Sequence, residues 1–272
     1  MILADYHMHS SNSGDSKAPM ESMIQSDIDK GLKEICFTEH MDMDFPRLPE
    51  LPPDPFLLDV EAYKKEFLIN KEKYSDKITL KFGIEIGMQP QIVAENTALA
   101  AKHDFDFIIA SEHLVDRMDP YYMQFWESQP SVKAGILRYF EQTLENIQLF
   151  TEYDVLGHLD YIARYVPKGD STYSYNAFRE VIDEILMVVI KSGKGLDLNS
   201  KALGGDFHMS NPCPEALARY KALGGKIITF GADAHAPEGV ALCFDKIREI
   251  ALSAGFTEYY TFDRRCPISH EL

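Results

Sequence analysis

Histidines and carboxylates recur in this chain at the ends of short apolar segments. The sequence DYHMHS places His7 and His9 two residues apart, directly after the apolar start of the chain. Similar groups follow other apolar segments, and these are His40, Glu85, His113, His158, Asp160, Asp233 and His235. Imidazoles bind zinc, manganese or iron, and a carboxylate can bridge two such ions. The pattern therefore predicts a metal site.

The spacing within pairs of these residues indicates that their side chains point the same way. Residues i and i+2 of a β-strand share a face. Three pairs have this spacing: His7 and His9, His158 and Asp160, Asp233 and His235. One strand histidine is usually an ordinary core residue, but six at strand ends would be costly to bury without cations. We expect one shared site, with Asp15 from the loop SSNSGDS as a further ligand.

This number of ligands exceeds the four that zinc takes and is sufficient for two or three ions. A site with several ions activates water at neutral pH and stabilises negative charge on a reacting oxygen. We therefore expect a hydrolytic enzyme.

The elements that must position these groups alternate between apolar and amphipathic segments. Strands buried on both faces are predicted at 2–7, 34–40, 78–87, 105–113, 154–160, 194–200 and 226–235. Helices are predicted at 20–30, 60–73 with Asp59 as N-cap, 91–102, 132–150, 175–191, 214–223 and 240–254. This alternation is typical of parallel βαβ units. We expect residues 1–272 to form a single α/β domain, a closed barrel with the metal site at its C-terminal mouth. A doubly wound open sheet is the alternative.

Two segments interrupt this alternation. Residues 45–55 contain five prolines, and residues 115–130 are rich in aromatic residues, methionine and aspartate. Both follow predicted strand ends, and in a barrel such loops cover the mouth where substrates bind. The alternative is that they only pack over the rim.

The composition narrows the possible partners. The formal net charge of -16 disfavours nucleic acid, because an acidic surface repels phosphate backbones. The start MILADYH does not resemble a signal peptide, and no apolar run reaches the roughly 18 residues of a membrane span. The four cysteines are widely spaced, which is typical of reduced thiols. We expect a cytoplasmic protein that acts on a small molecule, without nucleic-acid or membrane partners.

In these motifs the chain resembles the polymerase and histidinol phosphatase (PHP) family. The family motifs D-x-H-x-H, T-E-H, S-x-H, G-H-x-D and D-x-H read DYHMH, TEH, SEH, GHLD and DAH here, with the third-strand Glu in GIE. The segments FDFIIASEH, GHLDYIARY and LGGKIITFGADAH resemble its stand-alone histidinol-phosphate phosphatases in particular. The resemblance implies a distorted, TIM-like (β/α)7 barrel with a centre of three metal ions (zinc, manganese or iron).

The resemblance also implies a role for each ligand. One ion is assigned to His7, His9, Glu85 and Asp233, a second to Asp15, His40 and His235, and a third to the bridging Glu85 with His113 and His158. Binding of the phosphate group of the substrate is assigned to Arg164 and Lys201. The implied reaction is hydrolysis of L-histidinol phosphate, a phosphomonoester, to L-histidinol and inorganic phosphate by a metal-activated hydroxide.

Other roles depend on side-chain directions. Asp160 is the candidate general acid, because its spacing from His158 predicts a shared face, and the alternative is that it orients a histidine. Glu39, beside His40, has the same two possible roles. Four residues in or near the two long loops are available to bind the imidazole and ammonium of the substrate: Asp42, Glu112, Tyr121 and Trp126.

Three other functions compete with this interpretation. One is a PHP phosphoesterase that acts on nucleotides or other small phosphomonoesters, and the negative charge disfavours nucleic-acid substrates. Another is an amidohydrolase, but those barrels often bridge metals with a modified lysine on strand four, where this chain has SEH. The third is a non-catalytic metal-binding domain, which is disfavoured because no ligand position carries an apolar residue.

Overall fold

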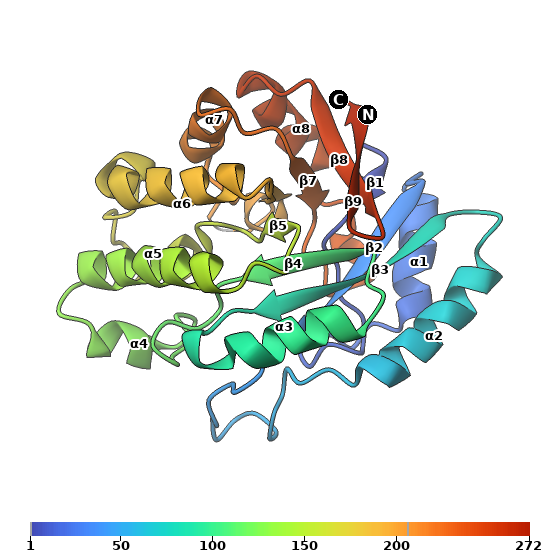
Figure 1. Ribbon diagram of the computed structural model, residues 1–272, viewed down its shortest axis with the longest axis horizontal. Helices are drawn as coiled ribbons and strands as arrows, with labels where there is room; N and C mark the ends of the chain where they lie inside the picture. The colour runs from blue at the N-terminus through green and yellow to red at the C-terminus, as the bar shows by residue number, and fades with distance from the viewer. Residues whose placement is uncertain (1, 206) are drawn as a thin grey trace.

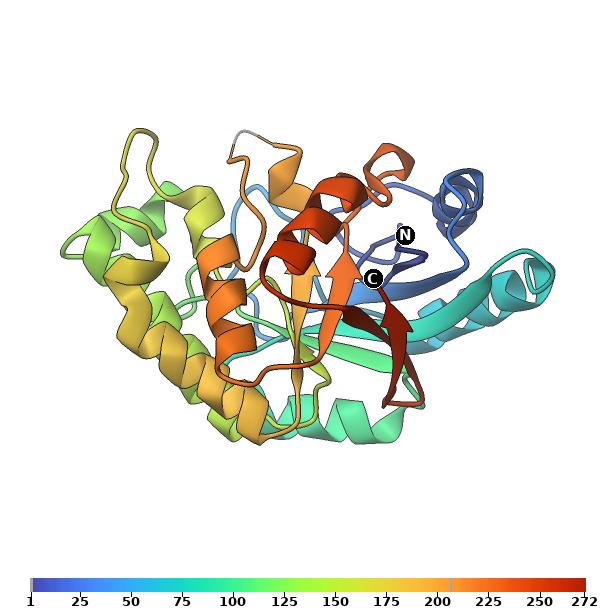
Figure 2. The ribbon, with the colours of Figure 1, turned by 90° about the horizontal axis from the view of Figure 1, so that it is seen from above.

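The computed structural model describes residues 2–205 and 207–272. In this part of the chain, seven parallel strands form one sheet in sequence order, with helices around it (Figures 1 and 2). They are β1 Ala4–Asp5, β2 Glu34–Met41, β3 Thr79–Gly87, β4 Phe107–Ser111, β5 Val155–Leu156, β6 Gly195–Asn199 and β7 Ile228–Gly231. Each lies within, or within one residue of, a predicted apolar segment. The strand prediction is confirmed.

The sheet closes through the segments that follow β1 and β7. Tyr6 N–H donates to the Phe230 carbonyl at 2.8 Å, and His9 N–H donates to the Ala234 carbonyl at 2.8 Å. A parallel bridge between Met8 and Ala234 lies between these contacts. The result is the expected distorted (β/α)7 barrel and excludes the open sheet. It is irregular because β1 and β5 have only two residues each.

The helices cover the outside of the barrel. They are α1 Met20–Asp29, α2 Val60–Lys73, α3 Val93–Lys102, α4 Met123–Ser128, α5 Val132–Leu149, α6 Arg179–Lys191, α7 Pro214–Ala222 and α8 Phe244–Ser253. All seven predicted helices are present, and α4 adds one within the loop 115–130. As predicted, Asp59 caps α2, because its carboxylate accepts from Ala62 N–H at 3.0 Å.

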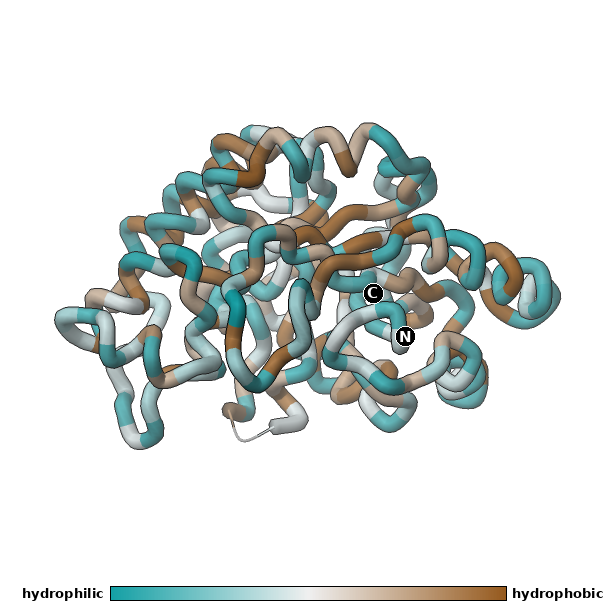
Figure 3. The backbone as a smooth tube through the Cα atoms, turned by 90° about the horizontal axis from the view of Figure 1, so that it is seen from below, coloured by the Kyte–Doolittle hydropathy of each residue, from teal (hydrophilic) through white to brown (hydrophobic). Residues whose placement is uncertain are grey.

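Apolar residues concentrate where helices and strands meet. In Figure 3 the brown, hydrophobic segments run along the central strands, while the outer turns of the helices are mostly teal. On α6, the residues Ile182, Ile185 and Val189 are fully buried at helical spacing. Among the described residues, no helix combines the length and the apolar character that crossing a bilayer requires.

An antiparallel hairpin, β8 Glu258–Asp263 with β9 Cys266–Glu271, was not predicted. Its side chains reach the starts of the barrel strands: Lys81 Nζ donates to Asp263 at 2.6 Å, and Arg265 Nε donates to Asp154. It therefore covers the end of the barrel opposite the mouth. The strand β9 was not recognisable from its sequence, CPISHE, because most of its residues are exposed and several are polar.

The hairpin makes a testable contribution to stability. Phe262 is 2% exposed and packs on Phe107 with 4.9 Å between ring centroids, so we expect Phe262→Ala to lower the free energy of unfolding by about 3–5 kcal/mol. Ile268, on the neighbouring strand, is 44% exposed, so Ile268→Ala should change it by less than about 0.5 kcal/mol. Urea denaturation of both variants measures these changes. Equal losses would contradict the packing role of the hairpin.

Candidate metal centre

The carboxyl ends of the strands bring the predicted ligands together. β2 and β3 pair in a register that places His40 opposite Glu85, so their side chains lie on the same face of the sheet. Other ligands follow the ends of β1, β4, β5 and β7, and these are His7, His9, His113, His158, Asp233 and His235. Every predicted ligand converges on the same end of the barrel.

The carboxylate of Glu85 lies at the centre of this cluster and is fully buried. Its Oε2 is near three ring nitrogens: His40 Nδ1 at 3.0 Å, His7 Nε2 at 3.2 Å and His9 Nε2 at 3.5 Å. Its Oε1 is near two more, His158 Nε2 at 3.0 Å and His113 Nε2 at 3.3 Å. Five imidazoles therefore surround one carboxylate, which is the position expected of a bridging ligand.

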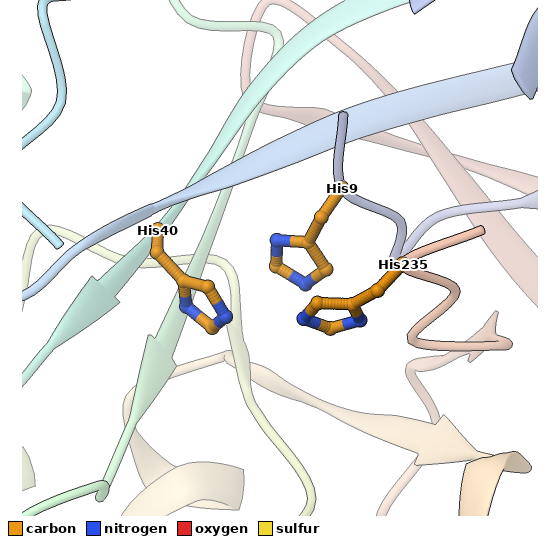
Figure 4. A group of neighbouring side chains, drawn as sticks. All are labelled: His9, His40 and His235. Atoms are coloured by element: carbon orange, nitrogen blue, oxygen red, sulfur yellow. The ribbon is translucent and has the colours of Figure 1, made fainter. Parts of the chain in front are cut away.

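A second group of predicted ligands lies on the side of Asp15. Asp15 Oδ2 is 2.9 Å from His235 Nε2 and 3.6 Å from His40 Nε2. The His9 ring is next to both of these histidines, with 4.2 Å between its centroid and each of theirs. Figure 4 shows the three rings gathered around a common space. The structure thus brings Asp15 to the cluster.

Backbone features at the end of β7 make room for the ligands. A Cβ atom at Gly231 would lie 2.3 Å from the Cβ atom of His7, so glycine allows the His7 side chain to enter the barrel. Asp233 has φ of 52°, in the left-handed region that aspartate tolerates better than most residues. Such conformations cluster at functional sites, where the surrounding structure maintains them.

Carboxylates behind the rings fix the orientation of two histidines. His7 Nδ1 is 2.8 Å from Asp197 Oδ2, and His113 Nδ1 is 2.7 Å from Asp42 Oδ1. Such a partner fixes the tautomer and turns Nε2 towards the metal position. Asp197 was missed in the sequence, although it has the same two-residue spacing from Asn199 on β6 as the ligand pairs have on other strands.

The donor set fits metal ions. Among the described residues, the buried atoms Nε2 of His7, Nε2 of His9 and Oε2 of Glu85 lack a hydrogen-bond partner. Burial lowers the pKa of His158 to about 4, which keeps its imidazole in the neutral form that binds metals. Burial also opposes protonation of His7, but Glu85 and Asp197 outweigh it and raise its pKa well above the usual range. Cations in the cluster would satisfy the unpaired atoms and the carboxylates.

A pocket of about 480 Å³ opens over the cluster and contains both predicted phosphate ligands. Arg164 Nη1 donates to Asp233 Oδ2 at 3.0 Å, and Lys201 Nζ donates to Asp233 Oδ1 at 3.0 Å. Two positive side chains therefore lie directly beside a predicted metal ligand. Phe45 and Phe56 also line the pocket.

The structure does not bring Asp160 into this pocket. Asp160 is fully buried, and its carboxylate accepts hydrogen bonds from Asn211 Nδ2 at 2.6 Å, from Cys213 N–H at 2.8 Å and from the Tyr173 hydroxyl. This geometry favours an orienting role over that of general acid. Its partner in that role is Asn211, whereas the sequence suggested a histidine.

Glu39 is also buried outside the pocket. Its carboxylate accepts from Ser10 N–H at 3.0 Å and from the Ser13 hydroxyl at 2.5 Å. The same hydroxyl lies 3.3 Å from His9 Nδ1. Glu39 therefore fixes the first loop and supports His9 through Ser13.

The four residues considered for substrate recognition fall into two groups. Asp42 lines the pocket while it holds His113, and the exposed Tyr121 packs edge-on against Tyr165 in the pocket wall. Glu112 and Trp126 lie outside the pocket, where side-chain amides and a main-chain carbonyl satisfy their polar atoms.

Five residues of the pocket lining were not predicted as site residues: Phe45, Phe56, Asp119, Tyr161 and Tyr165. The aromatic and acidic composition of residues 115–130 indicated where Asp119 would be found, and Tyr161 and Tyr165 flank Arg164 in YIARY. Which of these side chains turn inwards depends on the loop conformations.

Comparison with known proteins decides the family. The sequence profile of the PHP domain matches residues 5–201, more than half of the 272 residues. The chain belongs to the PHP family. This assignment confirms the resemblance that the motifs indicated.

Several known proteins match along nearly the whole chain. The histidinol-phosphatase of Lactococcus lactis is 34% identical over 95% of this chain and 93% of its own length, and a probable histidinol-phosphatase of Clostridium acetobutylicum is 31% identical over 97% and 98%. A crystal structure of the Lactococcus lactis histidinol phosphate phosphatase, complexed with zinc, L-histidinol and phosphate, has a TM-score of 0.89 at 32% identity and covers 98% of both chains.

The central carboxylate can be tested by metal analysis. Glu85→Gln keeps the side-chain shape but removes the charge that five imidazoles face, so we expect the variant to bind fewer metal ions, by about one per chain or more. Metal content after equilibration with zinc and removal of excess ions is the measurement. Glu95→Gln, at an exposed position of α3, is the matched control and should bind as many ions as the wild type. Unchanged metal content in Glu85→Gln would contradict the bridging role.

Proposed function

We propose that this protein hydrolyses L-histidinol phosphate to L-histidinol and inorganic phosphate at a centre of three metal ions. The observation that carries this proposal is a single pocket that joins the metal cluster to two positive side chains, Arg164 and Lys201. A crystal structure that resembles 98% of this chain comes from a histidinol phosphate phosphatase with zinc, L-histidinol and phosphate. In this chain, the pocket combines predicted metal ligands with Arg164 and Lys201, which are groups suited to bind a phosphomonoester.

Three sets of ligands support a centre of three ions. They are His7, His9, Glu85 and Asp233; Asp15, His40 and His235; and Glu85, His113 and His158. Metal ions in these positions would supply Lewis acidity, which lowers the pKa of water towards about 7 and neutralises charge on phosphate oxygens. The chain contributes the metal-binding side chains, and these largely buried residues form the floor of the pocket.

Phosphate oxygens would be held by Arg164 and Lys201. Within the described part of the chain, three of the five N–H groups of Arg164 donate to Asn211, Asn199 and Asp233, which leaves two for a ligand. The Lys201 ammonium is partly exposed at the same edge of the cluster. Fixed positive groups that meet charge on the equatorial oxygens are the main source of catalysis in phosphoryl transfer.

The outer part of the pocket suits the organic part of this substrate. Asp119 Oδ1 accepts from Tyr121 N–H at 2.8 Å, which leaves its second oxygen for a cationic ligand. Burial raises the pKa of Asp119 to about 6, so the group is an anion at neutral pH and can pair with an ammonium. Tyr161 and Tyr165 lie beside each other with 4.9 Å between ring centroids and offer aromatic surface to an imidazole.

The proposal is tested by phosphate release from L-histidinol phosphate, with p-nitrophenyl phosphate, AMP and a short 5′-phosphorylated oligonucleotide in parallel. We expect kcat/KM for L-histidinol phosphate to exceed the others by at least about a hundredfold and to lie in the usual range of about 10⁴–10⁸ M⁻¹s⁻¹. Comparable low rates on all substrates would favour a less specific phosphoesterase. Release from AMP alone would favour a nucleotide substrate.

The role of Asp119 gives a separate prediction. Asp119→Asn removes the negative charge near the pocket, so KM for L-histidinol phosphate should rise about tenfold, as expected for loss of a charged hydrogen bond. KM for p-nitrophenyl phosphate, which has no ammonium, should stay within about twofold. Asp116→Asn, in the same loop but outside the pocket lining, is the matched control. A parallel rise for both substrates would exclude ammonium recognition by Asp119.

A further inference from the structure

Two buried asparagines hold the guanidinium of Arg164 from behind the pocket. Arg164 Nε donates to Asn211 Oδ1 at 2.7 Å, and Arg164 Nη2 donates to Asn199 Oδ1 at 2.8 Å. Both asparagines are fully buried, and neither lines the pocket. Their contacts with Arg164 are therefore separate from any contact with substrate.

Each asparagine is in turn held by a buried carboxylate. Asn211 Nδ2 donates to Asp160 Oδ1 at 2.6 Å, and Asn199 Nδ2 donates to Asp197 Oδ2 at 3.2 Å. A carboxylate only accepts, so it binds the NH₂ end of each amide and leaves the oxygen end for the arginine. An amide is suited to this position because it donates at one end and accepts at the other.

The contacts fix the guanidinium on several sides. Nη1 makes a third hydrogen bond, to Asp233, and the guanidinium carbon lies 5.4 Å from the centroid of the Tyr161 ring. The Arg164 side chain is only 8% exposed. A planar group bound through Nε, Nη1 and Nη2 has little freedom to rotate. It is therefore oriented before a phosphate arrives, which reduces the entropy lost on binding.

We propose that Asn199, Asn211 and Asp160 are positioning residues that hold Arg164 in place for the phosphate group of the substrate. Asp160 acts through Asn211, and both asparagines act through the arginine. This inference rests on the proposed phosphatase function and adds residues that do not touch the substrate themselves.

The first test is Asn211→Ala, which removes the acceptor for Arg164 Nε. We expect KM for L-histidinol phosphate and the inhibition constant of inorganic phosphate to rise together by about tenfold, as for loss of a charged hydrogen bond. Metal content should equal that of the wild type, whereas general disruption of the site would lower it. Asn176→Ala, at an exposed asparagine, is the matched control and should change neither constant. Unchanged constants in folded Asn211→Ala would overturn the proposal.

A double-mutant cycle tests whether Asn211 acts through Arg164. In the background of Arg164→Ala, adding Asn211→Ala should change the inhibition constant of phosphate by less than about twofold, because the group that Asn211 orients is absent. The same tenfold loss in both backgrounds would mean that Asn211 acts independently, and it would overturn the proposal. If circular dichroism shows that Asn211→Ala is unfolded, Asn199→Ala provides the same cycle from the other side of the guanidinium.

Substrates with different leaving groups test Asp160. A positioning role predicts that Asp160→Asn lowers kcat/KM by the same factor for L-histidinol phosphate and for p-nitrophenyl phosphate, whose phenolate leaves without a proton. Loss confined to L-histidinol phosphate would assign Asp160 as the general acid and remove it from the proposal. Absence of phosphate release by metal-loaded wild type on both substrates would refute the phosphatase function itself. If the wild type is active and the asparagine variants have unchanged KM and phosphate inhibition constants, only the positioning role would be refuted.

Discussion

One buried carboxylate surrounded by five imidazoles is the interaction on which the rest of this structure depends. Glu85 is fully removed from water, and burying so many ionisable groups is costly unless opposite charges meet. Burial opposes protonation of His7, His40 and His113, yet the surrounding carboxylates raise the pKa of each well above its usual range. Positive charge is thus required at the centre, as protons or as metal ions. Metal ions that bind there would displace those protons, so their binding should strengthen as pH rises.

The barrel can gather many ionisable side chains around Glu85 because its parallel strands all end at the same edge. Register alone places His40 beside Glu85, and the closing hydrogen bonds between the segments after β1 and β7 carry His9 next to His235. Strands of two residues suffice for β1 and β5, since most of the ligands they deliver lie just beyond their ends. The opposite end of the barrel is covered by the β8–β9 hairpin. Stability and chemistry are therefore served by opposite ends of the same sheet.

The sequence predicted the barrel and eight of the nine cluster residues because strand ends and ligand types coincide, whereas Asp15 was inferred from a loop beside the cluster. The shared-face argument did not place Asp160 in the pocket, because the rule that residues i and i+2 share a face holds only while a strand continues, and β5 ends at Leu156. His158 and Asp160 follow that end, and the chain then turns into a short helix at Tyr161–Tyr165. Asp119 was missed for a similar reason, since no periodicity shows which loop side chains turn inwards. Partners such as Asp197, which holds His7, could not be predicted, because such contacts join segments that are far apart in the sequence.

Neutral amides between the arginine and its anchoring carboxylates have an electrostatic consequence. If Asp160 and Asp197 contacted Arg164 directly, together with Asp233, their charges would cancel the attraction of the guanidinium for a phosphate. Each carboxylate orients one asparagine, and that asparagine orients Arg164. The negative charges of Asp160 and Asp197 therefore do not contact the guanidinium. Among the described carboxylates, only Asp233 then pairs directly with the arginine. Metal ions that bind Asp233 would weaken that pairing. Occupation of the metal cluster should thus make Arg164 a stronger phosphate ligand.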